Sequence, residues 1–259
     1  MKYVIGIDLH GTLLDNDWEI KPKFYSALLK TLHTVSAFSN IYICTGNDLS
    51  FIDKYIPAAI RSCFSGFILE TGCVLSDGKS ETIIIPAEKT VNIRELEKLL
   101  KGMGFPEVKY FARRHCTISM FTRTETGGSD PANLKPTVEK AVRQLGFGDT
   151  VQVTHSNVAV DIIPIGFNKF TGIHHVAAGL KTIGIADSLN DIHLLIDATW
   201  AFIPANSSAS LICELGLIKR PVRSLAEWNM NSNKSIWRSQ YSTTEGVIDI
   251  LKFLEHNFK

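Results

Sequence analysis

The first residues able to do chemistry lie in the segment 3–15, YVIGIDLHGTLLD. The apolar run Tyr3–Ile7 has the length and β-branched content of a strand buried on both faces, and Asp8 ends it. Ligands of open α/β sheets bind at the carboxyl ends of strands, and Gly11 lets the backbone turn sharply and approach an anion. Asp8 is therefore a candidate nucleophile or metal ligand; the alternative is that it only caps the turn.

The same arrangement recurs after a second predicted strand, the apolar run Ile41–Cys44. Thr45 and Gly46 follow this run directly, so a small polar side chain and a glycine again stand at a carboxyl strand end. The alternative is that Thr45 caps a helix starting near Asp48. The repetition of the pattern favours a functional role.

Charged residues also surround a later predicted strand, Thr182–Ile185. Asp187 and Asp191 follow it and are four residues apart, so they face the same pocket if a helix begins between them. Lys169 stands at the start of the predicted helix Phe170–Ala178. The helix dipole disfavours a cation at the start of a helix. A functional role therefore explains Lys169 better than the alternative of a solvated surface lysine.

The elements that must position these residues alternate between strand-like and helix-like patterns. This alternation predicts an α/β fold with a Rossmann-like parallel sheet. The further predicted strands are Phe67–Leu69, Cys73–Leu75 and Thr199–Ile203, and the further helices are Lys23–Val35, Ser207–Leu215 and Glu245–Phe258. The polar stretch Arg223–Thr244 is predicted to be a long loop and receives no chemical role.

Residues 82–163 follow a different pattern, in which a helix and two strands occur twice. This order predicts a four-stranded antiparallel sheet with two helices on one face, a separate α+β domain inserted into the core formed by residues 1–81 and 164–259. The predicted helices are Val91–Met103 and Leu134–Leu145, and the strands are Val108–Ala112, Cys116–Thr122, Val151–Thr154 and Val158–Ile162.

Composition excludes several classes of function. The chain of 259 residues carries 27 basic and 26 acidic side chains, a net charge of +1 that argues against a general nucleic-acid surface or an anionic-membrane binder. Five cysteines without a CxxC pair suit reduced thiols better than a disulfide framework. Since neither a signal peptide nor a membrane span is recognisable, we expect a soluble, cytoplasmic protein.

Four short motifs, in order, resemble those of the haloacid dehalogenase (HAD) superfamily of phosphatases. The inserted domain lies between the second and third motifs, as does the cap of the Cof-like and sucrose-phosphatase-like branch that it resembles. The motifs are Asp8-x-His10-Gly11-Thr12, Thr45-Gly46, Lys169 and Asp187-Ser188-x-Asn190-Asp191.

The resemblance implies a phosphoryl-transfer site. Asp8 would attack phosphorus and form an aspartyl-phosphate, while Thr45, Gly46 and Lys169 would hold the phosphoryl oxygens. Asn190 would fix Lys169 beside them. Mg2+, a hard cation that prefers oxygen ligands, would be held by Asp8, the backbone carbonyl of His10, Asp187 and Asp191.

His10 departs from the family pattern, which has an aspartate that protonates the leaving alcohol and later activates water. Histidine titrates near neutrality and can do both, which predicts rates that follow an ionisation around pH 6 to 7. Two alternatives are an impairing replacement and a residue altered from the natural one.

The resemblance therefore implies a Mg2+-dependent phosphatase of a small phosphorylated metabolite such as a sugar phosphate. The alternative is an impaired protein that binds a phosphorylated ligand in a regulatory role. Candidate substrate contacts in the inserted domain are Arg113, Arg114, His115 and Asn157, against the alternative of surface charges at hairpin turns. Neither the physiological substrate nor the oligomeric state follows from the sequence.

Overall fold

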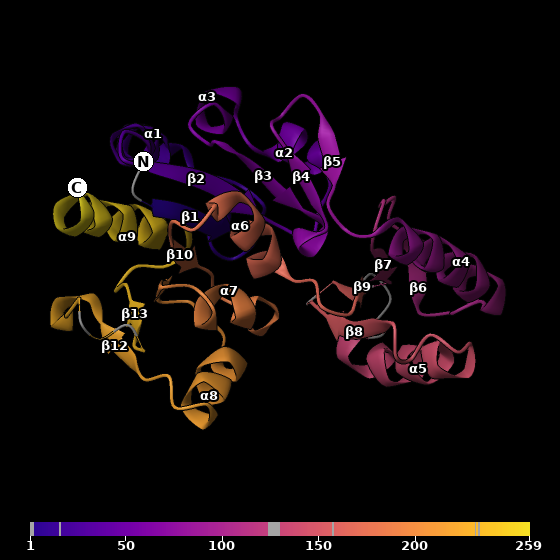
Figure 1. The fold of residues 1–259 in the computed structure, drawn as a ribbon. Coiled ribbons are helices and arrows are strands. Elements are labelled where there is room, and N and C mark those ends of the chain that lie inside the picture. The colour runs from indigo at the N-terminus through magenta and orange to yellow at the C-terminus, as the bar shows by residue number, and fades with distance from the viewer. Residues whose placement is uncertain (1–2, 16, 124–129, 157, 231, 233) are drawn as a thin grey trace. The chain divides into compact units, whose positions relative to one another are not determined.

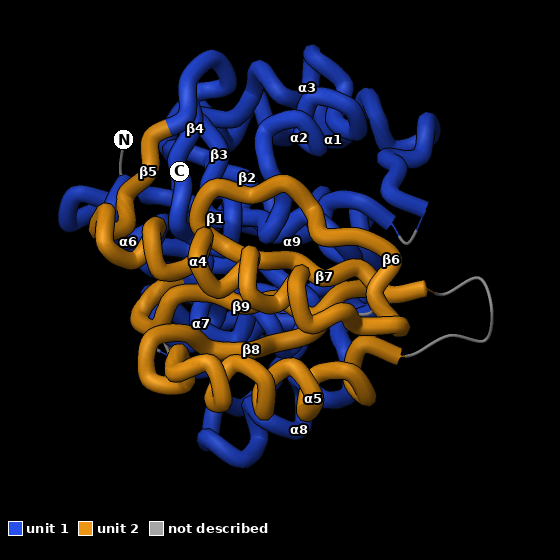
Figure 2. The backbone as a smooth tube through the Cα atoms, turned by 90° about the vertical axis from the view of Figure 1, so that its right-hand side faces the viewer, with its two compact units in different colours: residues 1–81, 168–259 blue, residues 82–167 orange. Residues whose placement is uncertain are grey.

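The computed structural model describes residues 3–15, 17–123, 130–156, 158–230, 232 and 234–259. The chain forms two compact units, coloured separately in Figure 2. Unit 1 comprises residues 1–81 and 168–259, and unit 2 comprises residues 82–167. The second junction therefore follows residue 167, whereas the sequence placed it after residue 163.

Among the described residues, nine strands form the larger sheet in the order β12-β13-β11-β10-β1-β2-β3-β4-β5 (Figure 1). Pairing is parallel from β12 to β3, and β3 pairs antiparallel with β4, so the predicted α/β class is confirmed. The strands are β1 Tyr3–Asp8, β2 Ser39–Cys44, β3 Gly66–Leu69, β4 Val74–Ser76, β5 Glu81–Ile83, β10 Lys181–Ile185, β11 Trp200–Ile203, β12 Val222–Ser224 and β13 Ile236–Arg238.

Helices cover both faces of this sheet (Figure 1). Successive side chains of a strand point to opposite faces: Val4 packs in one apolar cluster with Ile173 of α6 and Leu194 of α7, whereas the ring of Tyr3 meets Phe258 of α9 at 5.4 Å. The helices of unit 1 are α1 Pro22–Ser36, α2 Leu49–Tyr55, α3 Ala58–Arg61, α6 Lys169–Ala177, α7 Ile192–Ile196, α8 Ala209–Leu217 and α9 Thr243–Phe258, and its 3-10 turns are η1 Glu70–Gly72, η2 Leu189–Asp191 and η3 Leu225–Glu227.

Strand register brings the candidate site residues to one edge. In the parallel pairs of β1 with β10 and β2, Ile7 lies opposite Ile185 and Asp8 lies opposite Cys44. The segments that follow these three strands therefore leave the sheet at the same edge, as predicted for carboxyl strand ends.

The prediction of a continuous loop over residues 223–244 is wrong. The segment holds the end of β12, the turn η3 and the strand β13, which pairs in parallel with both β11 and β12. Trp237 in β13 is fully buried. A three-residue strand between polar stretches gives too short an apolar run to show a strand pattern.

Unit 2 has the predicted helix-strand-strand repeat. Its antiparallel sheet has the order β6-β7-β9-β8, and apolar side chains of the sheet and the two helices form one cluster that includes Ile118, Met120 and Leu134. The elements are α4 Ala87–Met103, β6 Val108–Phe111, β7 Ile118–Thr122, α5 Pro131–Gln144, β8 Val151–His155 and β9 Ala159–Pro164. Across the described part of the chain, no helix combines the length and apolarity needed to cross a bilayer.

Candidate active site

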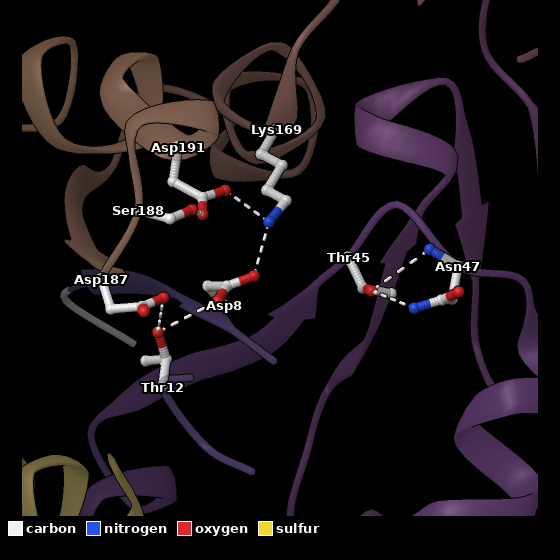
Figure 3. Close-up of polar contacts among 8 residues, drawn as sticks. All are labelled: Asp8, Thr12, Thr45, Asn47, Lys169, Asp187, Ser188 and Asp191. Carbon is white, nitrogen blue, oxygen red and sulfur yellow. Dashed lines mark hydrogen bonds and ion pairs between the residues drawn. The ribbon is translucent and has the colours of Figure 1, made fainter. Parts of the chain in front are cut away.

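Asp8 lies at the centre of a buried cluster of charged side chains at the edge of the sheet (Figure 3). Its side chain is almost fully buried, the residue being 4% exposed. The hydroxyl of Thr12 lies 3.0 Å from carboxylate oxygens of both Asp8 and Asp187, and its one proton can serve either acceptor. Thr12 therefore joins two of the acids that the sequence placed in separate motifs.

Lys169 reaches the same cluster from the first turn of α6. Its Nζ donates to Asp8 Oδ1 at 2.5 Å and forms an ion pair with Asp191. Burial alone would lower the pKa of Lys169, but the carboxylates of Asp191 and Asp8 outweigh it and raise the pKa above its ordinary value. Lys169 is thus a fixed positive charge beside Asp8.

The three acids form a candidate metal centre. Asp8, Asp187 and Asp191 offer oxygens that all lie within 4.8 Å of one another. Burial, followed by the charge of Asp8, raises the pKa of both Asp187 and Asp191 above the ordinary range. Three carboxylates against the ammonium of Lys169 leave two negative charges, and a hard divalent cation would offset both with the oxygen ligands that it prefers.

The turn after Asp8 is fixed from two directions. Gly11 has φ +76°, and a Cβ there would overlap the carboxylate of Asp187, so both backbone conformation and space require glycine. Asn206, in the loop after β11, donates from its side-chain amide to the Gly11 carbonyl at 2.7 Å. Thr244 at the start of α9 donates to the Leu13 carbonyl at 2.8 Å.

Thr45 and Gly46 form the turn after β2. The backbone amide of Thr45 donates to the carbonyl of Ile68 at 2.8 Å, and its hydroxyl accepts from the backbone and side-chain amides of Asn47 at 3.2 and 3.3 Å (Figure 3).

The turn η1, which follows β3, is close to the start of α6. A Cβ on Gly72 of η1 would overlap the backbone carbonyl of Asn168, the residue that caps α6. The neighbouring turn η1 therefore packs directly against the helix that carries Lys169.

His10 lies in an aromatic environment. Its ring centroid is 4.9 Å from that of Phe51 and 5.8 Å from that of Trp18. Burial, reinforced by the charge of Lys169, lowers the pKa of His10 to about 4. The side chain is therefore neutral at pH 7.

Two further residues join the site without having been assigned a role. Ser188 donates to Asp191 at 2.8 Å, and the Thr12 hydroxyl joins two acids as described above. Both residues lie inside the motifs. Their hydroxyl groups stand close in sequence to the predicted ligands Asp8, Asp187 and Asp191, and this proximity could have predicted the hydrogen bonds. By contrast, Asn190 is exposed, and its predicted role in fixing Lys169 stays a prediction.

The candidate substrate residues of unit 2 differ in burial. Arg113 is exposed, His115 is half-buried, and Arg114 is buried, donating to the Arg113 carbonyl at 3.0 Å. The Arg114 carbonyl in turn accepts from Arg94. Asn157 lies outside the described residues.

No protein-family model matches the sequence, and no curated protein matches it. Solved structures match along almost the whole chain. A sucrose-phosphatase from Synechocystis, solved with sucrose and phosphate, is 16% identical with a TM-score of 0.64, and the match covers 97% of this chain and 96% of that one.

Two other solved structures are equally similar. A HAD/Cof-like hydrolase from Plasmodium vivax is 15% identical with a TM-score of 0.66, covering 98% of this chain and 95% of that one. A HAD-superfamily phosphatase from Bacteroides thetaiotaomicron is 19% identical with a TM-score of 0.64, and the match covers 98% of this chain and 96% of that one. At these identities the likeness establishes the fold alone: an α/β core with an inserted four-stranded antiparallel domain, shared with these HAD-superfamily structures.

Proposed function

We propose that this protein is a Mg2+-dependent phosphatase of small phosphorylated metabolites, with sugar phosphates as the substrate class. The observation that carries the proposal is the buried cluster of Asp8, Lys169, Asp187 and Asp191 at the carboxyl edge of the sheet. Phosphoryl transfer depends mainly on positioning and charge neutralisation around an in-line nucleophile, and these four side chains combine a nucleophile with fixed charges of both signs.

Asp8 is the nucleophile of the proposed reaction. Its carboxylate oxygen forms a bond to phosphorus as the bond to the leaving alcohol breaks, which gives an aspartyl-phosphate. Water then attacks this phosphorus and regenerates the carboxylate. Lys169 balances negative charge on the phosphoryl oxygens through both steps, and the Thr45 hydroxyl and the backbone amides of its turn are their further donors.

Mg2+ fits the donor set, which consists of the carboxylates of the buried Asp8 and Asp191 and the half-buried Asp187. When all three are ionised, they exceed the charge of Lys169 by two negative charges. Asp8, Asp187, Asp191 and the backbone carbonyl of His10 would hold it. When bound, Mg2+ neutralises charge on the transferring phosphoryl group.

His10 serves the second half of the reaction in this proposal. Because its pKa is lowered to about 4, the neutral ring is able to accept the proton of the attacking water at pH 7. The same shift leaves only about one ring in a thousand protonated at pH 7, so His10 is a poor proton donor for a leaving alcohol. This observation also favours the second candidate function, an impaired phospho-ligand-binding protein.

The test of the proposal is Mg2+-dependent release of inorganic phosphate from one aryl phosphate and a panel of sugar phosphates. An aryl phosphate has a good leaving group and needs little proton donation. Phosphate release that requires Mg2+ supports the phosphatase. Saturable binding of a sugar phosphate with no release from any substrate would support the binding protein instead.

Replacing Asp187 with alanine is expected to raise the half-saturating Mg2+ concentration at least about tenfold, because a charged ligand is lost. The measurement is the Mg2+ dependence of aryl phosphate hydrolysis. Asp197→Ala is the matched control, since Asp197 is an exposed acid paired with His193 on the surface. An unchanged half-saturating concentration in Asp187→Ala would remove Asp187 from the metal centre.

The two neighbouring arginines of unit 2 should respond differently to substitution. Arg113→Ala is expected to change relative rates among sugar phosphates more than the rate on an aryl phosphate, because an exposed guanidinium is available for substrate hydroxyl or carboxylate groups. Arg114→Ala is expected to destabilise the fold by about 1–3 kcal/mol, because it removes a buried, hydrogen-bonded side chain. Rate ratios and thermal unfolding measure the two effects.

Arg143→Ala, which changes an exposed arginine on α5, is the control for both variants. Equal loss of activity on all substrates in Arg113→Ala would count against substrate contact.

The five cysteines of the sequence form no CxxC pair, which suits reduced thiols better than a disulfide framework. Because reduced thiols persist in reducing compartments, we place the proposed enzyme in the cytoplasm.

A further inference from the structure

Trp18 has a backbone conformation that bulky residues rarely adopt. Its φ is +63°, in the left-handed region, which is costly for a side chain with a Cβ and marks constrained or functional positions. The neighbouring buried Asp15 holds this conformation: one carboxylate oxygen accepts from the amides of Asp17 and Glu19 at 3.0 and 3.1 Å, and the Asp15 carbonyl accepts from the amide of Trp18 at 3.1 Å.

This turn places the indole against His10. The ring of Trp18 meets His10 edge-on at 5.8 Å, and Phe51, from the first turn of α2, meets His10 at 4.9 Å. Trp18 and Phe51 also contact each other at 5.6 Å, so the three rings form a closed triangle of edge-to-face contacts. The imidazole is thus held from two sides by apolar rings that come from different segments.

Tyr55 belongs to the same cluster but has a different position in it. It contacts Trp18 at 5.4 Å and Phe51 at 4.4 Å, whereas among the described ring contacts His10 meets only Trp18 and Phe51. Its removal would disturb the packing of the cluster without removing a ring from His10. Tyr55 is therefore a natural control position.

We propose that Trp18 and Phe51 are positioning residues that fix the orientation of the His10 imidazole for hydrolysis of the aspartyl-phosphate. The strained turn at Trp18 is the cost of bringing the indole onto His10, and Asp15 stabilises that turn. The inference rests on the proposed phosphatase function and adds a specific requirement to it: the second step depends on the two rings, and the first step, attack by Asp8, does not.

The kinetic test separates the two steps with an aryl phosphate in Mg2+, by rapid mixing. Formation of the aspartyl-phosphate appears as a burst of phenolate, and its hydrolysis sets the steady-state rate. In Trp18→Gly, where glycine adopts the same φ without strain, and in Phe51→Leu, the steady-state rate should fall about 10- to 100-fold with the burst rate retained, because misplaced catalytic groups cost factors of this size. In Tyr55→Leu the two rates should keep their wild-type ratio.

A second measurement is independent of turnover. The His10 Cε1–H resonance, assigned in histidine-labelled protein by its loss in His10→Gln, feels the ring currents of Trp18 and Phe51. It should shift in Trp18→Gly and Phe51→Leu and keep its position in Tyr55→Leu.

An unshifted resonance in both ring variants, or equal slowing of burst and steady state, would overturn the positioning role. A wild-type protein that releases no phosphate from any ester would overturn the proposed function, while the resonance would still decide whether the rings hold His10.

Discussion

Replacing Asp8 with asparagine is expected to lower phosphate release by about 10³-fold or more, because an amide does not attack phosphorus as a carboxylate does. The structure adds a second reason. Asp8 Oδ1 accepts from Lys169 at 2.5 Å, and asparagine removes the negative charge that faces this ammonium. The amide NH2 group is then left to face the Thr12 hydroxyl, 3.0 Å from Oδ2. The measurement is phosphate release from an aryl phosphate at saturating Mg2+.

Two controls accompany Asp8→Asn. Asp149→Asn makes the same chemical change at an exposed position of unit 2 and should leave the rate at its wild-type value. Circular dichroism and thermal unfolding verify that Asp8→Asn is folded. Turnover near the wild-type level in a folded Asp8→Asn protein would falsify the covalent mechanism.

The clustering of the candidate site residues was predictable because it depends on strand ends. Three buried apolar runs end at or just before a polar residue, namely Asp8, Thr45 and Asp187. Such ends identify the carboxyl edge of a parallel sheet, and strand register brings them together. The inserted domain was predictable for a similar reason, since its alternation of helix and strand patterns spans many residues. Of its two junctions with the core, the first was predicted after residue 81, where the structure has it. The second was predicted four residues too early, because the apolar stretch 159–167 runs across the boundary without a change of pattern.

Other features depend on contacts that no local pattern encodes. Trp18 and Phe51 meet His10 from separate segments, and Asn206 reaches Gly11 across 195 positions of sequence. The strand β13 owes its burial to the neighbouring strands β11 and β12 and not to its own three residues. Tertiary context of this kind overrides a weak local signal.

The environment of His10 corrects the expected pH dependence. The sequence predicted an ionisation around pH 6 to 7, the ordinary range of histidine, whereas burial and Lys169 lower the pKa of His10 to about 4. Above that pKa the protonated fraction falls about tenfold per pH unit. Any proton donation by His10 to a leaving alcohol should therefore increase as the pH falls from 7 toward 5.

The change of His10 to aspartate is expected to raise turnover of an alkyl phosphate about 10²-fold at pH 7 and that of an aryl phosphate less than about tenfold, within the range that general acid catalysis supplies. The physical reason is the site itself. Burial lowers the protonated fraction of a histidine but raises the pKa of a carboxyl group, and the nearby acids raise the pKa of a carboxyl group further. An aspartic acid at position 10 therefore keeps its proton more readily near pH 7. Alkyl alcohols are poor leaving groups that need this proton, whereas phenols are good leaving groups that do not need it.

The measurement is a pH–rate profile from 5 to 8 for wild type and His10→Asp, with one alkyl and one aryl phosphate. In wild type the alkyl rate should rise toward low pH while the aryl rate stays flat, because only the alkyl reaction gains from protonated His10. In His10→Asp the alkyl rate should be higher across the range and fall only as the new carboxyl ionises. A gain confined to the aryl phosphate would contradict the leaving-group argument, and a loss on both substrates would identify His10 as the acid–base group that this site requires.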